Sequence, residues 1–306
     1  MPSIIIPTLG GRRRLQQIDR NLENIDLDWN IILVINRPGG HGDTHAQYSL
    51  ITLPSGRSAA TVDIGRGGIP KARAAGLKRA KEQHVLFLDD DICVPRGSAE
   101  RLLREVQTGR ADIVSGRILE HENFPDEFAT LVSHDRGSAA RSSADDLSQY
   151  RSPFEVWRLG SGSVLALDRA SLNRRIPHGE FFDADFHDRW LLKAGEDLDF
   201  LLKALSAGAK VKYCSDIIFF HNEDANVMDL QRKSEAYTRG KAALYWKWRS
   251  FCTVSDLKQD TASRLVANRV AVRDVGTLIR LRSQLTPIHT FLGLFAAAFK
   301  RLERQE

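Results

Sequence analysis

The chain has 306 residues, 42% hydrophobic and 27% charged, which is the composition of a globular protein with a substantial core and excludes a disordered or fibrous chain. The net charge of +5 would suit nucleic acid, an anionic membrane or a diphosphate ligand. No helix-turn-helix, RNP or zinc-module pattern accompanies the basic residues, so we expect no nucleic-acid partner.

Strands and helices alternate over the first hundred residues. Apolar runs predict strands at residues 3–7, 30–35, 51–53, 61–64 and 84–88, and amphipathic spacing predicts helices at 13–23 and 70–83. Residues 37–46, rich in glycine, proline and histidine, are typical of a loop. Because alternating strands and helices form right-handed crossovers, we predict an α/β fold with a mostly parallel sheet.

Glycines at 65, 67 and 68 precede the second helix. Their spacing departs from the Gly-x-Gly-x-x-Gly pattern, so we do not predict a dinucleotide site. Glycine lets a backbone approach a ligand closely, and a helix amino end attracts phosphate. We therefore expect this segment and Arg73 to face the phosphates of a ligand; the ordinary alternative is that Arg73 is a surface arginine.

Three carboxylates, Asp89, Asp90 and Asp91, end the apolar run at 85–88. A buried strand that ends in adjacent acids delivers them to the ligand-binding edge of a sheet, where a divalent cation offsets their repulsion. Carboxylate oxygens favour Mg²⁺ or Mn²⁺. Strand alternation places Asp89 and Asp91 on one side, so the sequence predicts a cation site there, against the alternative of a solvated turn.

The pattern changes after residue 112. A strand is predicted at 112–118, and residues 120–152 are polar. Within them, residues 138–148 almost lack large apolar groups and predict either a mobile loop over the site or local disorder. A second strand is predicted at 157–167, with the glycine-serine residues 160–163 inside it.

A second acidic pair, Glu196 and Asp197, follows Gly195 and opens an apolar-periodic helix. Acids are favoured in a first helical turn by the helix dipole, so ordinary capping would also explain this pair. A strand predicted at 211–221 then ends in His221, and a histidine in such a place is usually structural.

These motifs together resemble the inverting GT-A glycosyltransferases of family 2, which transfer a sugar from a nucleoside diphosphate donor. The similar segments are the first strand at 4–8, the donor-side helix at 69–76, the metal motif at 88–91, the acidic pair after Gly195, and His221. The resemblance implies a GT-A, Rossmann-like catalytic domain over residues 1–225. Residues from 1 to about 115 would bind the nucleotide sugar, and about 116–225 the acceptor.

The resemblance also implies roles for individual residues. Asp89, Asp91 and His221 would bind Mg²⁺ or Mn²⁺. Asp197 would be the general base that takes the proton of the acceptor hydroxyl, and Glu196 would shape the site. The residues that would contact the donor are Pro7, Thr8, Asn36, Arg73, Asp89 and Asp90.

Two positions depart from the family pattern. Asn36 stands where many members carry an acid that contacts the nucleotide base, and Ala74 stands where an asparagine commonly follows the arginine. A UDP-sugar is therefore only the default donor, with GDP- and dTDP-sugars open. The acceptor hydroxyl could belong to a glycan, a lipid-linked sugar, a peptide or a small molecule.

Residues 226–306 are predicted to form a helical C-terminal extension. Its last helix carries apolar residues at helical spacing from 288 to 302, followed by basic residues. This face would pack against the catalytic domain, against a second subunit in a homodimer, or on an anionic membrane.

The amino-terminal residues lack a basic region followed by a long apolar core, and no stretch approaches the roughly 20 apolar residues of a membrane span. The three cysteines are odd in number and widely spaced, so neither a disulfide framework nor a zinc cluster is predicted. We expect a cytoplasmic protein, with peripheral membrane contact left open.

Three alternatives stay open. A sugar nucleotidyltransferase would use a glycine- and arginine-rich loop after the first strand, and residues 10–14 partly supply one, although that reaction has no role for Glu196 and Asp197. A retaining GT-A enzyme shares the metal motif, so inversion rests on the resemblance alone. A catalytically silent binding module is disfavoured because the acids are intact.

Overall fold

The structure is a computed structural model. It describes residues 1–25, 28–37, 47–65, 67–120, 142–144, 156, 159–176, 179–187, 194–222, 236, 240, 243–244 and 247–248. The predicted loop at 37–46 lies almost wholly outside these residues, as do most of the polar stretch at 120–152 and most of the predicted C-terminal extension, including its last helix.

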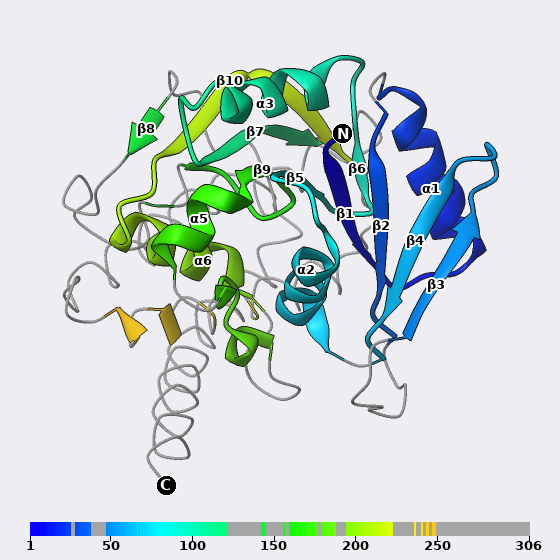
Figure 1. Cartoon of the computed structure of the whole chain (residues 1–306), viewed down its shortest axis with the longest axis horizontal. Coiled ribbons are helices and arrows are strands. Elements are labelled where there is room, and N and C mark those ends of the chain that lie inside the picture. The colour runs from blue at the N-terminus through cyan, green and yellow to red at the C-terminus, as the bar shows by residue number, and fades with distance from the viewer. Residues whose placement is uncertain are drawn as a thin grey trace, which may run out of the picture.

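A single ten-stranded sheet runs through the described part of the chain (Figure 1). Its strands are β1 (Ser3–Thr8), β2 (Asn30–Ile35), β3 (Gln47–Thr52), β4 (Ser58–Asp63), β5 (His84–Leu88), β6 (Ile92–Cys93), β7 (Ile113–Glu120), β8 (Ser142–Ala144), β9 (Val164–Asp168) and β10 (Val211–His221). Their order is β3-β4-β2-β1-β5-β9-β7-β10-β6, and β8 pairs with β10.

The pairing divides the sheet into two parts. Strands β4, β2, β1 and β5 are parallel neighbours, as predicted from the first hundred residues, and only the edge strand β3 runs antiparallel there. Beyond β5 the sheet is mixed, because β9 is antiparallel to both β5 and β7 while β7 and β10 are parallel. The carboxyl ends of β1, β2 and β5 therefore share one edge of the sheet.

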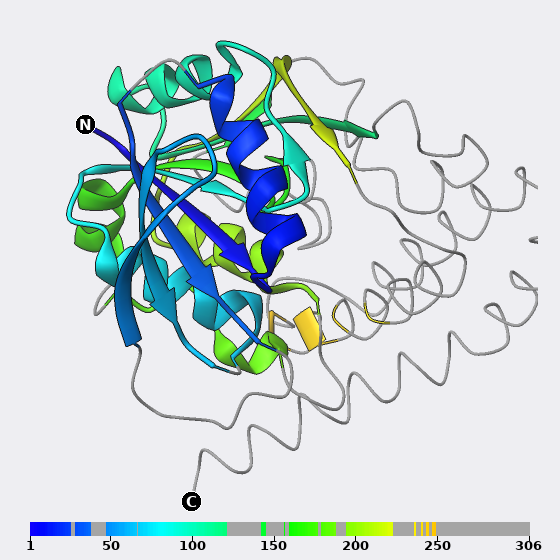
Figure 2. The same ribbon diagram turned by 90° about the vertical axis from the view of Figure 1, so that its right-hand side faces the viewer.

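Helices cover both faces of the sheet (Figures 1 and 2). They are α1 (Arg12–Glu23), α2 (Gly68–Arg79), α3 (Ser98–Gln107), α5 (Arg169–Arg175), the 3₁₀ helix η4 (Ala184–His187) and α6 (Glu196–Ser206). The buried side chains of α1 and α3 belong to one hydrophobic cluster, and those of α2, α5 and α6 belong to the other. The result is a three-layer α/β arrangement.

Glycine permits the closest of these contacts. A Cβ built on Gly76 of α2 would lie 2.3 Å from Cγ2 of Ile5 in β1, a separation that real atoms do not take. The small residue therefore lets α2 approach the sheet and seats Arg73, one turn earlier, at the edge where the strands end.

The predicted elements agree with the structure in type and order, but several bounds differ. The strands predicted at 51–53 and 61–64 are β3 and β4, which begin four and three residues earlier, and the helix predicted at 70–83 is α2, which ends at Arg79. The strands at 30–35, 84–88 and 211–221 have the predicted bounds. The strand predicted at 157–167 is too long, because β9 begins at Val164 and residues 160–163 form a turn in which Gly160 has a φ of +107°. Within 138–148, Ser142–Ala144 form an edge strand on β10 rather than loop or disorder.

Among the residues that the structure places, no helix is both long and apolar enough to span a bilayer.

Candidate active site

The three acidic residues after β5 lie in a turn at the carboxyl edge of the sheet. The backbone N–H of Asp89 donates to the carbonyl of Ser163 at 3.0 Å, and the N–H of Ile92 donates back to the carbonyl of Asp89 at 3.2 Å. The turn ends the strand at Leu88, so the alternation expected through Asp91 does not continue. Each of the three carboxylates consequently has different partners.

Arg73 reaches into this edge from α2. Its side chain is only 2% exposed, and its guanidinium donates to Asp89 at 3.0 Å and to Glu196 at 3.3 Å. Its Cζ lies 6.0 Å from the ring centre of Phe182. Burial disfavours the charge, but Asp89, Glu196 and Asp197 outweigh that effect and raise the pKa of Arg73. Arg73 is thus a buried cation, not a surface arginine.

Glu196, the first residue of α6, is buried beside Arg73. Desolvation, together with the neighbouring charge of Asp197, raises the pKa of its carboxyl to about 7, although Arg73 opposes the shift. Around neutral pH this side chain is therefore divided between the charged and the neutral form.

The stability of the protein should report this titration. Between pH 4.5, the usual value, and pH 7 the folded state holds more protons on Glu196 than the unfolded state, so the free energy of unfolding falls as pH rises. Glu196→Gln removes the contribution, which is on the order of 3 kcal/mol for a pKa raised from 4.5 to about 7. Thermal melts of both proteins from pH 4.5 to 7.5 should show a flatter profile for the variant. Parallel profiles would contradict the assignment.

Asp197 is fixed by two backbone hydrogen bonds. Its Oδ2 accepts from the N–H of Gly162 at 3.1 Å, and its Oδ1 accepts from the N–H of Leu198 at 2.8 Å. A Cβ built on Gly162 would lie 2.4 Å from Nη1 of Arg73 and 2.8 Å from Cβ of Asp197. A larger residue at position 162 would clash with both side chains, so the close contact of the 160–163 turn with Arg73 and Asp197 requires glycine.

Asp90 turns toward β1 and α1. It accepts a hydrogen bond from Thr8 Oγ1 at 2.6 Å and lies 3.6 Å from the guanidinium of Arg14. Burial raises its pKa to about 6, while the contacts with Thr8 and Arg14 act in the opposite direction. Thr8 and Asp90, both predicted to contact a donor, are therefore direct neighbours.

Asp91 and His221 lie together, as predicted. His221 ends β10 and pairs with Ile92 in the sheet, and its Nε2 lies 3.5 Å from Oδ2 of Asp91. Asp89, the third predicted ligand, contacts Arg73 instead. In the part of the chain that the structure describes, no three His, Cys, Asp or Glu side chains gather closely enough to hold one metal ion.

Asn36 follows β2 and caps the amino end of α2. Its Oδ1 accepts hydrogen bonds from the backbone N–H groups of Gly67 and Gly68 at 3.0 and 3.1 Å. These are donors that a helix start leaves unpaired. The contact joins two segments predicted to bind the donor, while contact between Asn36 and a nucleotide base stays a prediction. Pro7 is buried within β1.

Three residues make contacts at this edge that the sequence did not predict: Arg14, Gly162 and Phe182. Arg14 was considered only within the 10–14 loop of the nucleotidyltransferase alternative, and Gly162 only as one of the glycines in an expected strand. Phe182 carried no signal beyond its apolar character, because its contact with Arg73 depends on tertiary packing.

Comparison with known sequences bears on what this edge does. Residues 3–169 match the family described as Glycosyl transferase family 2. This match covers more than half of the chain. The chain belongs to glycosyl transferase family 2. The matched residues include Asp89–Asp91 and Arg73. Residues 194–222, with Asp197 and His221, lie beyond the match.

One curated relative of this family 2 chain is the uncharacterized glycosyltransferase YwdF of Bacillus subtilis (strain 168). The two are 30% identical over 173 residues, which is 54% of this chain and 56% of the relative. The match thus spans about half the length of that protein.

Two solved structures are similar in fold to this family 2 chain. TarS 1-349 of S. aureus in complex with UDP-GlcNAc matches with a TM-score of 0.51 and 14% identity, covering 99% of this chain and 92% of that one. The mannosyltransferase PcManGT of Pyrobaculum calidifontis, in complex with GDP-Man and Mn²⁺, matches with a TM-score of 0.52 and 15% identity, covering 100% and 88%. At such identities the likeness shows the fold, and the predicted GT-A fold is confirmed.

Proposed function

We propose that this protein transfers a sugar from a nucleoside diphosphate donor to an acceptor hydroxyl, with inversion at the anomeric carbon and Asp197 as general base. The observation that supports this most is the shared edge at which Arg73, Asp89, Glu196 and Asp197 meet, although they come from segments up to 124 residues apart, from 73 to 197. Family membership and nucleotide-sugar complexes of similar folds agree with it.

The donor would lie over the amino end of α2, near the β5 turn. The Nε–H of Arg73 is a buried donor without a hydrogen-bond partner among the described residues, and a phosphate or sugar oxygen can satisfy it. Thr8 and Asp90 border the same edge from β1 and β5. Arg73 already offsets the charge of Asp89, so the diphosphate meets less repulsion.

A divalent cation fits Asp91 and His221. A carboxylate oxygen and an imidazole nitrogen, 3.5 Å apart, form a donor pair that suits Mn²⁺ or Mg²⁺. Oxygens of the diphosphate and of water would complete the ligand set, because Asp89 is paired with Arg73. When bound, such a cation supplies positive charge that stabilises the departing diphosphate.

The proton of the acceptor would pass to Asp197. Each oxygen of this carboxylate accepts one backbone N–H and keeps a second lone pair, so the side chain is oriented and still able to accept a proton. Glu196, tied to Arg73, would border the sugar and hold its hydroxyls. Proton transfer from the hydroxyl as it attacks is what the reaction needs of a base.

The function can be tested with a panel of donors. We expect one of the UDP-, GDP- or dTDP-sugars, with Mn²⁺, to raise the melting temperature by about 5 °C at a concentration near 100 times its Kd. The same donor should be turned over to free nucleoside diphosphate, and NMR of the product should show an inverted anomeric centre. Pyrophosphate release from a nucleoside triphosphate would indicate a nucleotidyltransferase instead, and an uninverted product would indicate a retaining enzyme.

A further inference from the structure

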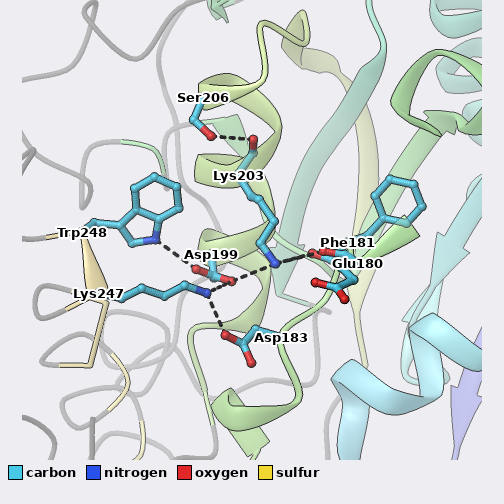
Figure 3. Close-up of polar contacts among 8 residues, drawn as sticks. All are labelled: Glu180, Phe181, Asp183, Asp199, Lys203, Ser206, Lys247 and Trp248. Atoms are coloured by element: carbon cyan, nitrogen blue, oxygen red, sulfur yellow. Dashed lines mark hydrogen bonds and ion pairs between the residues drawn. The ribbon is translucent and has the colours of Figure 1, made fainter. Parts of the chain in front are cut away.

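Asp199 is a carboxylate buried on the catalytic helix, two residues beyond Asp197. None of its side-chain surface is exposed to solvent. Lys247 Nζ donates to its Oδ2 at 2.8 Å and Trp248 Nε1 donates to its Oδ1 at 2.9 Å, so both oxygens are satisfied from the far end of the described chain (Figure 3). Lys203, one turn along α6, lies 3.7 Å away.

Gly240 and Leu244, which precede Lys247, lie against the turn that begins α6. A Cβ built on Gly240 would lie 2.2 Å from the carbonyl oxygen of Ala194, so the two backbones touch. Gly195, with a φ of +102°, lies against Leu244, whose Cδ1 would be 3.3 Å from an added Cβ. Leu244 belongs to the same hydrophobic cluster as the buried face of α6.

Lys247 links two parts of the site. Besides Asp199 it contacts Asp183 at 2.8 Å (Figure 3). Its Nζ also lies 5.3 Å from the ring centre of Phe186. Asp183 directly follows Phe182, the aromatic neighbour of Arg73. The ammonium thus joins the start of α6 to the loop that packs on Arg73.

We propose that Lys247 and Trp248 are positioning residues that hold Asp197 and Phe182 in the site by fixing Asp199 and Asp183. The reason is the cost of a buried carboxylate without partners, which would drive α6 away from its present place. The start of α6 must stay within hydrogen-bond reach of Gly162, because that contact orients Asp197. This inference deepens the proposed function and rests on it for the effect on transfer.

The test uses the full chain and compares Lys247→Met with Lys212→Met. Lys212 pairs with Glu105 of α3 and is less exposed than Lys247, so its variant reports the effect of losing an ordinary ion pair. We expect Lys247→Met to lower kcat for transfer by about ten- to a hundredfold, because a displacement near 1 Å costs as much, with donor binding within about twofold of wild type. Lys247→Arg should restore most of the rate, and Lys212→Met should leave it unchanged.

Hydrogen exchange gives a readout that needs no substrate. The amides of residues 198–202 should exchange at least tenfold faster in Lys247→Met than in wild type or Lys212→Met. Gly240→Ala, which forces the backbones apart at Ala194, should act in the same direction.

The outcomes separate the two proposals. Unchanged exchange at 198–202 in Lys247→Met overturns the positioning role, whether or not transfer is detected. Equal losses of kcat in Lys247→Met and Lys212→Met overturn it too, since the effect would then be general destabilisation. If the wild type transfers no sugar from any donor, the proposed function fails, and the exchange result still decides the positioning role.

Discussion

Replacing Asp197 with asparagine should lower the rate of sugar transfer by about 10²–10⁴-fold, the usual contribution of a general base. The amide keeps the size of the side chain and one acceptor oxygen, but it cannot take the acceptor's proton. Donor binding, measured as the rise in melting temperature with nucleoside diphosphate and Mn²⁺, should change little. The distinction matters because Arg73 and the β5 turn, not Asp197, would hold the diphosphate.

Asn at this position also loses one acceptor for a backbone N–H, since Oδ2 accepts from Gly162 and Oδ1 from Leu198. Rates should therefore be measured well below the melting temperature of the variant. Asp28→Asn is the matched control, because Asp28 is an exposed carboxylate just before β2, at the opposite edge of the sheet. Turnover by Asp197→Asn within about threefold of this control would remove Asp197 from the role of base.

The sequence predicted which residues lie at the carboxyl edge of the sheet, but not which side chains contact one another there. Apolar runs that end at Leu88 and His221 indicate buried strands, and parallel strands end together, so Asp89–Asp91 and His221 were correctly expected at one edge. Which carboxylate faces which partner depends on the turn after Leu88. Side chains alternate between the two faces only along extended backbone. The rule therefore does not apply to the turn in which the N–H of Ile92 donates to the carbonyl of Asp89.

Local sequence patterns do not predict contacts between segments that are distant in the chain. The bond between Asp197 and Gly162 requires α6 and the 160–163 turn to meet, and neither segment signals the other. The contacts of Asp199 are likewise not predicted by local patterns. Its place in the first turn of α6 indicates an ordinary acid favoured by the helix dipole, whereas in the structure it is buried and paired with Lys247. Local propensity gives elements and their ends, whereas such pairings depend on how the layers pack.

Removing the charge of Arg73 should have the largest effect on stability. Arg73→Met keeps much of the buried volume but leaves Asp89 and Glu196 without their cation. Breaking a buried ion pair by removing one partner typically costs about 3–5 kcal/mol, which is a large share of the stability of a domain. Urea unfolding should show this as a lower midpoint with an unchanged slope.

The matched control is Arg101→Met. Arg101 contacts Asp216 at 2.8 Å, but the two side chains are 50% and 43% exposed, so this pair should contribute less than about 1 kcal/mol. If Arg73→Met costs no more than Arg101→Met, the buried network does not stabilise the fold. Arg73→Lys should fall between wild type and Arg73→Met, because one ammonium cannot span two carboxylates as the guanidinium fork does.

A double variant identifies the physical origin of the loss. If Arg73→Met is costly because Glu196 is stranded as a buried anion, adding Glu196→Gln should recover part of the stability, since the double variant buries one charge fewer. If the loss came from packing alone, the two effects would add. Recovery should be greater at pH 8 than at pH 5. The loss of Arg73 removes a charge that opposes the raised pKa of Glu196, so the free-energy cost of burying this carboxyl grows with pH over that range.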